Sequence, residues 1–377
     1  MGYFQSWKHV PRGHRYLIPV TIIAGIPLLH LLLHLFHSEP SLPTISIQEN
    51  FPKAASARSP SDLPPIPHWN APPKPHDNLK TPLFIGFSQN WPLLQQALVS
   101  LLTAGWPASD IYIVDNTGTM QSNLRGNLSP DNPSYLPYDR LLNIFEVNII
   151  NTPTQLSFAQ YQNFLLYEAL QRGLEYYFWA HMDIVVLSGQ VVEGEYQSFY
   201  RRALADFRSG LESKESWAVR FYSYDRLALV STSALDALGG WDTSIPYYPS
   251  DCDLNIRMDQ AGYRNPSPYI GQFYDVHKST PDLEAFYHAQ PGSTIWHDLR
   301  NEFSNLMDQK NKHERNTWQW YQGGEGEPYS YNYKAAQWVR SMMIDEGQRV
   351  FKRKWGTAKC RPDTRGLRAW DQYRMAS

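Results

Sequence analysis

Hydrophobic residues are distributed along this chain in two ways: one long, mostly apolar run near the N-terminus, and short runs separated by polar segments after residue 82. The long run, residues 17–36, contains no Asp, Glu, Lys or Arg. At about 1.5 Å per residue it would extend over about 30 Å, the thickness of a bilayer core. The pattern therefore predicts one transmembrane helix over residues 16–37.

The charges that flank this run predict its orientation. Lys8, Arg12 and Arg15 precede it and Glu39 follows it, and cytoplasmic segments of membrane proteins carry the excess of Lys and Arg. We therefore expect a cytoplasmic tail over residues 1–15 and a lumenal remainder, which is a type II topology. A cleaved signal peptide is the alternative, but its apolar region would be shorter and no small-x-small cleavage site follows.

Proline is abundant in the next segment, residues 38–81, which lacks apolar periodicity. Such a segment buries too little surface to offset the entropy lost on ordering. The composition therefore predicts an extended stem between the membrane and the rest of the chain.

From residue 82 onward, strand and helix patterns alternate. Strands are predicted at 83–87, 111–114, 142–150 and within 176–187, and helices at 91–103 and 158–173. Strands that alternate with helices predict an α/β fold with a doubly wound, mostly parallel sheet. We expect this domain to cover residues 82–345, in halves 82–190 and 191–345. The second half carries an irregular aromatic-rich C-terminal extension, and a basic tail follows over residues 346–377.

Composition narrows the choice of partners only slightly. The formal net charge is −2, so the overall balance does not favour nucleic acid as a partner. Aromatic residues make up 14% of the chain and suit stacking on sugar rings, although Trp and Tyr also fill cores. Whether Cys252 and Cys360 pair in an oxidising lumen stays open. The glycosylation acceptor sequence at Asn127 is usable only on the lumenal side.

Two aspartates stand where a ligand site is expected in such a sheet. Asp115 ends the second predicted strand, and Asp183 lies in the fourth. Ligands of open α/β sheets bind beyond the carboxyl ends of the strands. An Asp at a strand end can equally close a turn or cap a helix, so the neighbouring motifs have to decide.

Four stretches between residues 82 and 280 resemble the GT-A superfamily of glycosyltransferases, most closely glycosyltransferase family 2 and its relatives. The first is the strand 83–87 with the strand end Val114-Asp115-Asn116, and the second is the helix 157–173. The resemblance implies a nucleotide-sugar site, with the acid at the strand end near the base or ribose and the helix near the phosphates. The residues implied are Asp115, Asn163, Gln160 and Phe87.

The third stretch, Trp179-Ala180-His181-Met182-Asp183, stands where the family has an apolar strand that ends in Asp-x-Asp. In the family these carboxylates hold Mn²⁺ or Mg²⁺, which neutralises the diphosphate as the glycosidic bond breaks. Here His181 replaces the first Asp, so the resemblance implies Asp183 as the direct metal ligand with His181 beside it. His277 is a candidate late ligand, although a lone His is more often structural.

The fourth stretch joins Gly239-Gly240-Trp241-Asp242 to Ser250-Asp251-Cys252-Asp253 and resembles the acceptor-side segment of the family. In inverting members of the family, the residue that aligns with Asp251 is the general base that takes the proton from the acceptor hydroxyl. The resemblance therefore implies this role for Asp251 if the reaction inverts, and the sequence leaves inversion or retention open. Gly240, Trp241 and Asp253 would support Asp251, and Ser250 replaces the Glu that is usual in the family. Helix N-capping is the alternative for the acidic pair.

The anchor and the motifs together predict a membrane-anchored, metal-dependent glycosyltransferase of the Golgi or ER. It would move a sugar from a nucleotide-sugar donor to a lumenal glycan, protein or lipid acceptor. The substitutions at His181 and Ser250 keep open a second class, a catalytically impaired relative that binds glycans or a partner. A nucleotidyltransferase is disfavoured, because residues 86–90 lack the repeated glycines and the lysine of a phosphate loop. The loop 323–327 is either a mobile lid or an exposed connection.

Overall fold

The computed structural model describes residues 49–72, 79–189 and 195–360. The predicted cytoplasmic tail, the predicted transmembrane helix and the first residues of the predicted stem lie outside these ranges, as does the end of the basic tail. Every helix within the described ranges is too short or too polar to cross a membrane.

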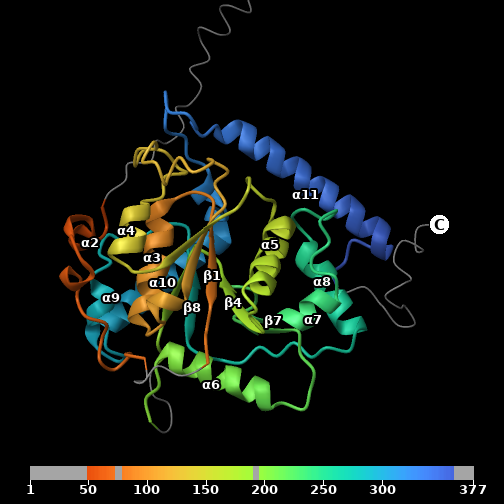
Figure 1. The fold of residues 1–377 in the computed structure, drawn as a ribbon, viewed down its shortest axis with the longest axis horizontal. Coiled ribbons are helices and arrows are strands. Elements are labelled where there is room, and N and C mark those ends of the chain that lie inside the picture. The colour runs from red at the N-terminus through yellow and green to blue at the C-terminus, as the bar shows by residue number, and fades with distance from the viewer. Residues whose placement is uncertain (1–48, 73–78, 190–194, 361–377) are drawn as a thin grey trace, which may run out of the picture. The chain divides into compact units, whose positions relative to one another are not determined.

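A six-stranded sheet in the order β3-β2-β1-β4-β7-β6 lies at the centre of the domain (Figure 1). β1 pairs in parallel with β2 and β4, and β2 with β3, whereas β7 runs antiparallel to both of its neighbours. The prediction of an α/β fold with a mostly parallel sheet is thereby confirmed. The strands are β1 (Leu83–Phe87), β2 (Ile111–Asp115), β3 (Asn148–Asn151), β4 (Tyr176–Ala180), β6 (Val219–Tyr222) and β7 (Leu227–Ser231).

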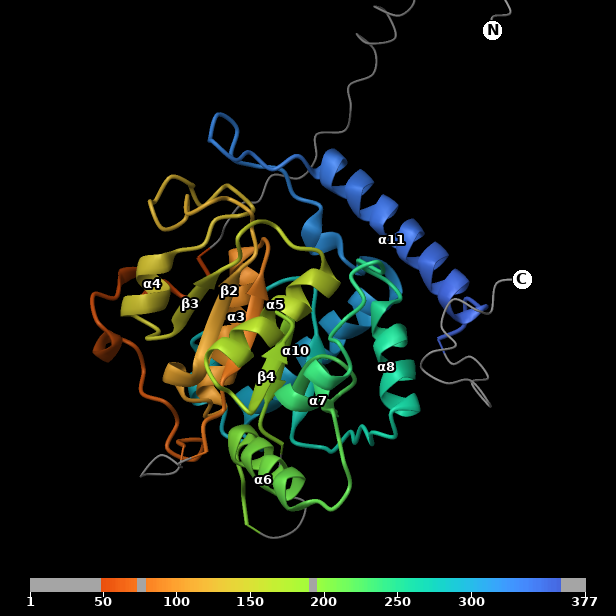
Figure 2. The same ribbon diagram turned by 45° about the vertical axis from the view of Figure 1, so that its right-hand side comes forward.

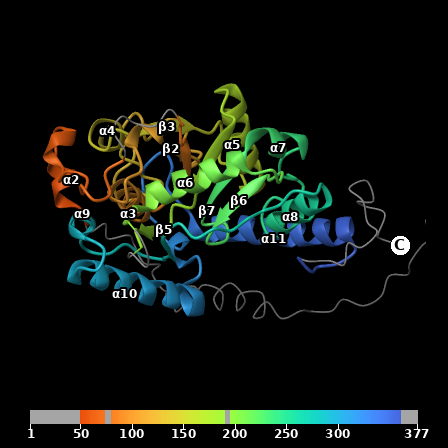
Figure 3. The same ribbon diagram turned by 90° about the horizontal axis from the view of Figure 1, so that it is seen from below.

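The alternation of side chains along the strands produces two apolar faces. Ile85 and Phe178 belong to the buried cluster that α3 (Trp91–Thr103) joins, whereas Phe84 belongs to the cluster of α5 (Phe158–Gln171). Both helices form where the sequence predicts them. Figure 3 shows α5 and α10 (Thr294–Gln309) on opposite sides of the strands.

The predicted strand within residues 176–187 is two strands that belong to different sheets. β4 ends at Ala180, and β5 (Ile184–Leu187) pairs antiparallel with β8 (Gln272–Asp275) in a second, two-stranded sheet. α3 packs against β5 and α10 against β8. Residues 181–183 therefore form the link between the two sheets, which is where the metal motif is predicted.

The predicted strand over residues 142–150 is largely wrong. α4 (Tyr138–Asn143) occupies its beginning, and β3 covers only Asn148–Asn151. Leu141 has no exposed surface while Leu142 is 44% exposed, so only Leu141 lies on the buried face of this helix. A short apolar run cannot by itself distinguish a helix from a strand.

Residues 49–72 correct the prediction of an extended stem, because they pack against the domain. Phe51, at the start of α2 (Pro52–Ser56), has no exposed surface, and its ring centroid lies 5.7 Å from that of Tyr287. Asn70 is buried and donates a hydrogen bond to the carbonyl of Thr103 at 2.8 Å. One large apolar side chain and one polar anchor order this proline-rich segment despite its composition.

Helices α8 (Ser250–Gln260) and α11 (Tyr333–Trp355) lie side by side (Figures 1 and 2). Phe351 of α11 is in the same buried cluster as Cys252 of α8, and Cys252 forms a disulfide with Cys360. Lys352 and Arg353 are exposed, as expected of a solvated helix face, but Lys354 is buried. The first part of the predicted basic tail is thus a packed helix.

The remaining elements complete the layers around the two sheets. They are η1 (Pro60–Asp62), η2 (Ala108–Asp110), α6 (Phe199–Glu212), α7 (Thr232–Ala237), α9 (Ala285–His288), η3 (Lys310–Glu314) and η4 (Thr317–Gln319).

Candidate active site

The link between the two sheets is held by backbone hydrogen bonds on both sides. The amide of His181 donates to the carbonyl of Arg226 at 3.1 Å, and the amide of Val276 donates to the carbonyl of Asp183 at 2.9 Å. Asp183 is 7% exposed. Because the backbone is fixed at both ends of the link, the side chains of His181 and Asp183 have defined positions.

Asp183 is paired with a buried lysine. Lys310 Nζ lies 2.7 Å from Asp183 Oδ2, and the same ammonium donates to Asp275 Oδ1. Burial alone would raise the pKa of Asp183, but the charge of Lys310, assisted by that of His181, holds this pKa below its ordinary value. Burial and the nearby Asp183 charge raise the pKa of Asp275. Asp183 is therefore the carboxylate that stays ionised more readily.

His181 stands between two carboxylates. Its Nδ1 lies 3.9 Å from Asp183 Oδ1, and its Nε2 lies 3.6 Å from Asp225 Oδ2. Burial would lower the pKa of His181, but the adjacent Asp225 carboxylate outweighs burial and raises this pKa above its ordinary value. The arrangement favours the imidazolium form of His181 beside the Asp183–Lys310 pair.

Asp225 belongs to the turn of residues 223–226 that connects β6 to β7. Ser223 and Tyr224 have φ values of 56° and 62°, and a left-handed backbone costs roughly 1–2 kcal/mol at a residue other than glycine. Strained turns that are retained in this way cluster at functional sites. This turn conformation places the side chain of Asp225 next to His181 and the side chain of Tyr224 next to α8.

Asp251 lies in the first turn of α8 and accepts a hydrogen bond from the Tyr224 hydroxyl at 2.6 Å. Burial, together with the Asp251 carboxylate, raises the pKa of Tyr224, so the phenol remains the donor. Through the adjacent residues Tyr224 and Asp225, the turn connects the predicted base to His181 and Asp183. Residues from three separate stretches of the chain thus meet at one place.

The residues predicted to hold Mn²⁺ or Mg²⁺ do not form a ligand set. Across residues 49–72, 79–189 and 195–360, no three His, Cys, Asp or Glu side chains are grouped so that they could hold a metal ion. His277 follows β8, where burial lowers its pKa and its Nδ1 has no hydrogen-bond partner among the described residues. The cation that Asp183 contacts is the Lys310 ammonium. The donors therefore do not fit the predicted metal, and we derive no catalytic step through one.

Asp115, predicted to contact the nucleotide base or ribose, organises the loop after β2. Its Oδ1 accepts from the amide and the hydroxyl of Thr117, at 3.0 and 2.6 Å. Its Oδ2 accepts from Asn123 at 3.3 Å and from the Tyr138 hydroxyl at 2.8 Å. A carboxylate has about four acceptor positions, so a nucleotide could bind Asp115 only by replacing one of these contacts.

Phe87 and Gln160 are not placed to contact a nucleotide. Phe87 has no exposed surface, because the odd-numbered residues of β1 face the apolar cluster shared with α3. Gln160 is exposed, but its Oε1 accepts a hydrogen bond from the Ser157 amide at 3.0 Å and so caps the start of α5. The prediction that Phe87 contacts the nucleotide is therefore corrected, because the alternation of side chains along β1 turns this ring into the core.

Asn163 holds the glycine turn on the acceptor side. Its amide group donates to the Trp241 carbonyl at 2.9 Å and accepts from the Trp241 amide at 2.7 Å. Gly240 has φ of 68°, and a Cβ at that position would lie 2.5 Å from Asn163 Oδ1, so only glycine fits there. Asn163 therefore stabilises the segment of Gly240 and Trp241 in this structure, whereas the motif predicts a place near the phosphates.

Asp253, the second acid of the predicted acceptor segment, is a structural residue. It has no exposed surface and forms ion pairs with Arg257 and Lys354 at 2.9 and 2.7 Å. Trp355 Nε1 also donates to it at 2.9 Å. The contacts with Lys354 and Trp355 fasten α11 to α8, next to the helix turn that carries Asp251.

The loop 323–327 is tied to the loop after β2. Glu327 accepts hydrogen bonds from the Ser129 amide at 3.0 Å and from Asn132 Nδ2 at 2.9 Å. Asn127, two residues before Ser129, is exposed. This loop is anchored at Glu327, which favours a connection over a free lid.

The motif analysis missed Tyr224, Asp225 and Lys310. A turn between two apolar runs, Val219–Tyr222 and Leu227–Ser231, is visible in the sequence and would place Tyr224 and Asp225 in a hairpin. Lys310 carries no such signal, because it lies in a charged run that is typical of a solvated helix. Only the tertiary fold brings it to Asp183.

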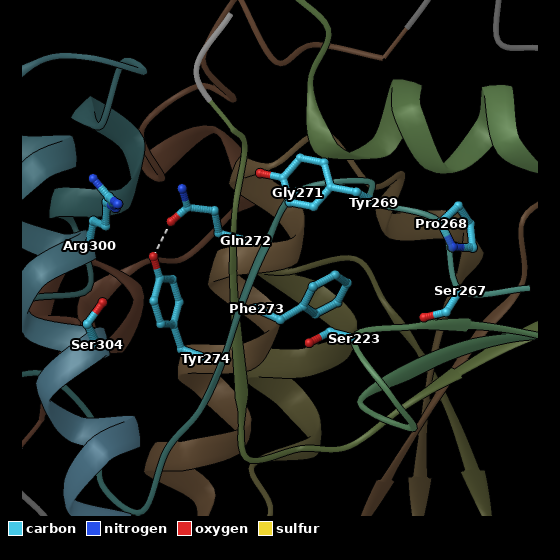
Figure 4. Close-up of a pocket in the computed structure, with 10 residues that line it drawn as sticks. All are labelled: Ser223, Ser267, Pro268, Tyr269, Gly271, Gln272, Phe273, Tyr274, Arg300 and Ser304. Carbon is cyan, nitrogen blue, oxygen red and sulfur yellow. Dashed lines mark hydrogen bonds between the residues drawn. The ribbon is translucent and has the colours of Figure 1, made fainter. Parts of the chain in front are cut away.

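A cavity of about 520 Å³ lies beside the hairpin (Figure 4). Ser223 contributes to its wall, and Arg300 and Ser304 project into it from α10. Figure 4 also shows the Tyr274 hydroxyl bonded to the side chain of Gln272. None of the carboxylates described above lines this cavity.

No family model matches the chain, and no curated protein matches it. Solved structures with similar folds include TarS of S. aureus, at 11% identity and a TM-score of 0.35 over 63% of this chain and 45% of that one. The mannosyltransferase PcManGT from Pyrobaculum calidifontis, in complex with GDP-Man and Mn²⁺, gives 14% identity and 0.31 over 74% and 76%. GalNAc-T7 with UDP, GalNAc and Mn²⁺ gives 11% identity and 0.37 over 72% and 56%.

One of these structures is named a mannosyltransferase, and two of them contain Mn²⁺ with a nucleotide or nucleotide sugar. The chain resembles all three. The chain spans about half the length of TarS and of GalNAc-T7, and at these TM-scores no site residue can be aligned between the structures.

Proposed function

We propose that the chain is a glycosyltransferase that moves a sugar from a nucleotide-sugar donor to an acceptor hydroxyl. One observation carries the proposal: Asp251 is held by Tyr224, whose neighbour Asp225 is paired with His181 next to Asp183. The group therefore combines a carboxylate available as a base with a histidine whose protonated form would be a positive charge for a diphosphate leaving group.

The reaction needs one proton transfer and one exchange of bonds at the anomeric carbon. Asp251 takes the proton of the acceptor hydroxyl while that oxygen bonds to the anomeric carbon and the bond from this carbon to the phosphate oxygen breaks. The released nucleoside diphosphate carries the electron pair of the broken bond, and we assign to His181 the positive charge that would stabilise it. Asp251 has this role if attack and departure occur on opposite faces of this carbon, which inverts its configuration.

The membrane topology belongs to the proposal as well. Residues 16–37 would anchor the chain in the Golgi or ER membrane, residues 1–15 would be cytoplasmic, and the acceptor would be a lumenal glycan, protein or lipid. The Cys252–Cys360 disulfide supports an oxidising compartment. An N-linked glycan on Asn127 that an endoglycosidase removes is the expected sign of this topology, whereas protease digestion of the C-terminus from the cytosolic side would contradict it.

A catalytically impaired relative that binds glycans or a partner is the second candidate. It is favoured by one observation: the contacts of Asp115 occupy the acceptor positions that a nucleotide would use. The two candidates differ in whether a nucleotide sugar is hydrolysed or transferred.

Hydrolysis of a panel of UDP-, GDP- and CMP-sugars by the purified full-length chain tests the proposal. We expect one donor to be hydrolysed, and Asp251→Asn to abolish this activity. Asp236→Asn, an exposed position on α7, is the matched control and should behave as wild type. Equal background hydrolysis by wild type and Asp251→Asn for every donor would favour the non-catalytic candidate.

A further inference from the structure

The ammonium of Lys310 is enclosed by oxygen atoms. Its side chain is 4% exposed, and Nζ contacts Asp183 Oδ2 at 2.7 Å, the Val276 carbonyl at 3.0 Å, and Asp275 Oδ1. A lysine ammonium has three donor hydrogens, so these three acceptors satisfy it completely. This is a built cation site whose cation is part of the chain.

The position of Lys310 is set by a packed helix. Lys310 begins the π-helical turn Lys310–Glu314 directly after α10, and α10 is anchored by Phe303, which has no exposed surface. The ring of Phe303 contacts those of Tyr274 on β8 and Phe286 on α9, with centroids 5.9 and 5.5 Å apart. The packing of α10 in the core thus fixes the position of Lys310 next to β8.

We infer that Lys310 is a resident counter-cation that occupies the cation position of Asp183, so that Asp183 positions this ammonium and donor binding needs no divalent metal. A divalent ion bound to Asp183 would sit about 2.0–2.6 Å from a carboxylate oxygen. The ammonium already lies 2.7 Å from Oδ2. A metal at that oxygen would have to displace Lys310 and leave a buried charge without one of its partners, which is strongly unfavourable.

The inference deepens the proposed function and rests on it only for the statement about the donor. The statement about Asp183 and Lys310 is a property of the protein itself. The inference corrects the prediction from the motif in one respect. Asp183, the last acid of the substituted Asp-x-Asp, holds the ammonium of Lys310 and not a metal ion. Asp183 is thereby a positioning residue in this proposal.

Binding of Mn²⁺ by the full-length chain, followed by electron paramagnetic resonance with and without UDP, tests the inference. Wild type and Asp183→Asn should bind Mn²⁺ equally weakly, because the position is filled. Lys310→Met should gain a Mn²⁺ site about tenfold tighter or more, since two buried carboxylates then lack a cation. The double variant Lys310→Met/Asp183→Asn should lose this gain, and Lys312→Met, an exposed lysine on the same turn, should show none.

Thermal unfolding provides a second readout. Lys310→Met should lower the Tm by roughly 5–10 °C, and Mn²⁺ should restore much of this loss, while EDTA should not change the Tm of wild type. If Lys310→Met does not fold, wild type and Asp183→Asn decide: Asp183-dependent Mn²⁺ binding by wild type overturns the inference, and equal binding supports it. A folded Lys310→Met that gains no Mn²⁺ site also overturns it.

The donor assay separates this inference from the proposed function. Donor hydrolysis by wild type that persists in EDTA supports both. Hydrolysis that stops in EDTA and returns with Mn²⁺ overturns the inference and leaves glycosyl transfer in place. No hydrolysis under either condition counts against glycosyl transfer, while the binding comparison still decides the role of Lys310.

Discussion

Asp251 and Tyr224 share the hydrogen bond on which the proposed chemistry depends. We expect Asp251→Asn to lower kcat by about 10²–10⁴, the usual contribution of a general base, with the donor KM little changed. Tyr224→Phe keeps the ring but removes the donor that orients the carboxylate at 2.6 Å. Its kcat should fall by roughly tenfold, in keeping with one hydrogen bond to a charged group.

Steady-state kinetics with the donor found in the panel measures both variants. Tyr167→Phe, on the exposed face of α5 where Tyr167 is 54% accessible, is the matched control and should keep wild-type kinetics. An Asp251→Asn variant with wild-type kcat would exclude this residue as the base. A Tyr224→Phe variant with a raised donor KM alone would assign Tyr224 to donor binding.

Asn163 has two competing roles that one substitution separates. The structure bonds its amide to both backbone groups of Trp241, whereas the motif places it at the donor phosphates. Asn163→Ala should therefore lower the free energy of unfolding by about 2 kcal/mol and leave the donor KM unchanged in urea-denaturation and kinetic experiments. Asn143→Ala, at an exposed position of α4, should alter neither quantity; a raised KM without loss of stability would restore the phosphate role.

At the scale of single residues, the sequence predicts which side chains belong to one cluster. It predicts less well which partner each of these side chains contacts. Asp251 and His181 are found in the same cluster because the motifs that carry them lie at the ends of elements that the apolar pattern locates. Phe87 was assigned to the site from its place in a motif, yet the period of a strand buries it. Lys310 could not be found, because its partners are far apart in the sequence.

At the scale of elements, α11 is held on the domain by a buried lysine. Lys354 Nζ lies 2.7 Å from Asp242 Oδ2 and 2.7 Å from Asp253 Oδ1. Burial would raise the pKa of Asp242, but Lys354, with help from Ser244, lowers it below its ordinary value. The ionised Asp242 is thus more stable in the folded protein than in the unfolded chain.

Asp242→Asn should weaken this attachment in a pH-dependent way. Because the folded pKa of Asp242 is depressed, its contribution is complete above the unfolded pKa of about 4 and is lost as pH falls through the folded value. The variant should be about 1–2 kcal/mol less stable than wild type at pH 7, and the difference should shrink below about pH 4 in urea titrations. Asp236→Asn is the control, and a difference that does not change with pH would contradict the ion-pair explanation.

The elements whose bounds the sequence predicts well have both a clear hydrophobic period and a residue that marks where the element ends. α3 begins after Asn90, whose side chain accepts a hydrogen bond from the Leu93 amide at 3.3 Å, and it is followed by Gly105 with φ of 98°. The run 142–150 has no such signals. At residues 181–183, no feature of the sequence marks the change from one sheet to the other. Both errors arise because tertiary pairing decides where a short strand begins and ends.

At the scale of the whole molecule, the C-terminal region packs against the helix that carries Asp251. The sequence predicted a basic tail there, and the structure instead has α11 packed on α8, with a disulfide joining Cys252 to Cys360. The pairing could not be deduced, because two cysteines 108 residues apart are equally compatible with free thiols. The same limit applies to residues 49–72, where composition hides the few contacts that order the segment.

The disulfide connects the stability of the domain to the compartment in which it folds. Closing a loop of 108 residues stabilises a domain by about 4–5 kcal/mol in the chain-entropy model. Cys360→Ser should therefore lower the Tm by several degrees, whereas kcat at low temperature should stay near wild type, because Lys354 and Trp355 of α11 still bind Asp253 of α8. Differential scanning calorimetry and kinetics measure these effects, with Ser213→Ala at an exposed loop position as the control. Since such a bond forms only in an oxidising compartment, thiol labelling of both cysteines in protein taken directly from cells would contradict the disulfide and the proposed lumenal location together.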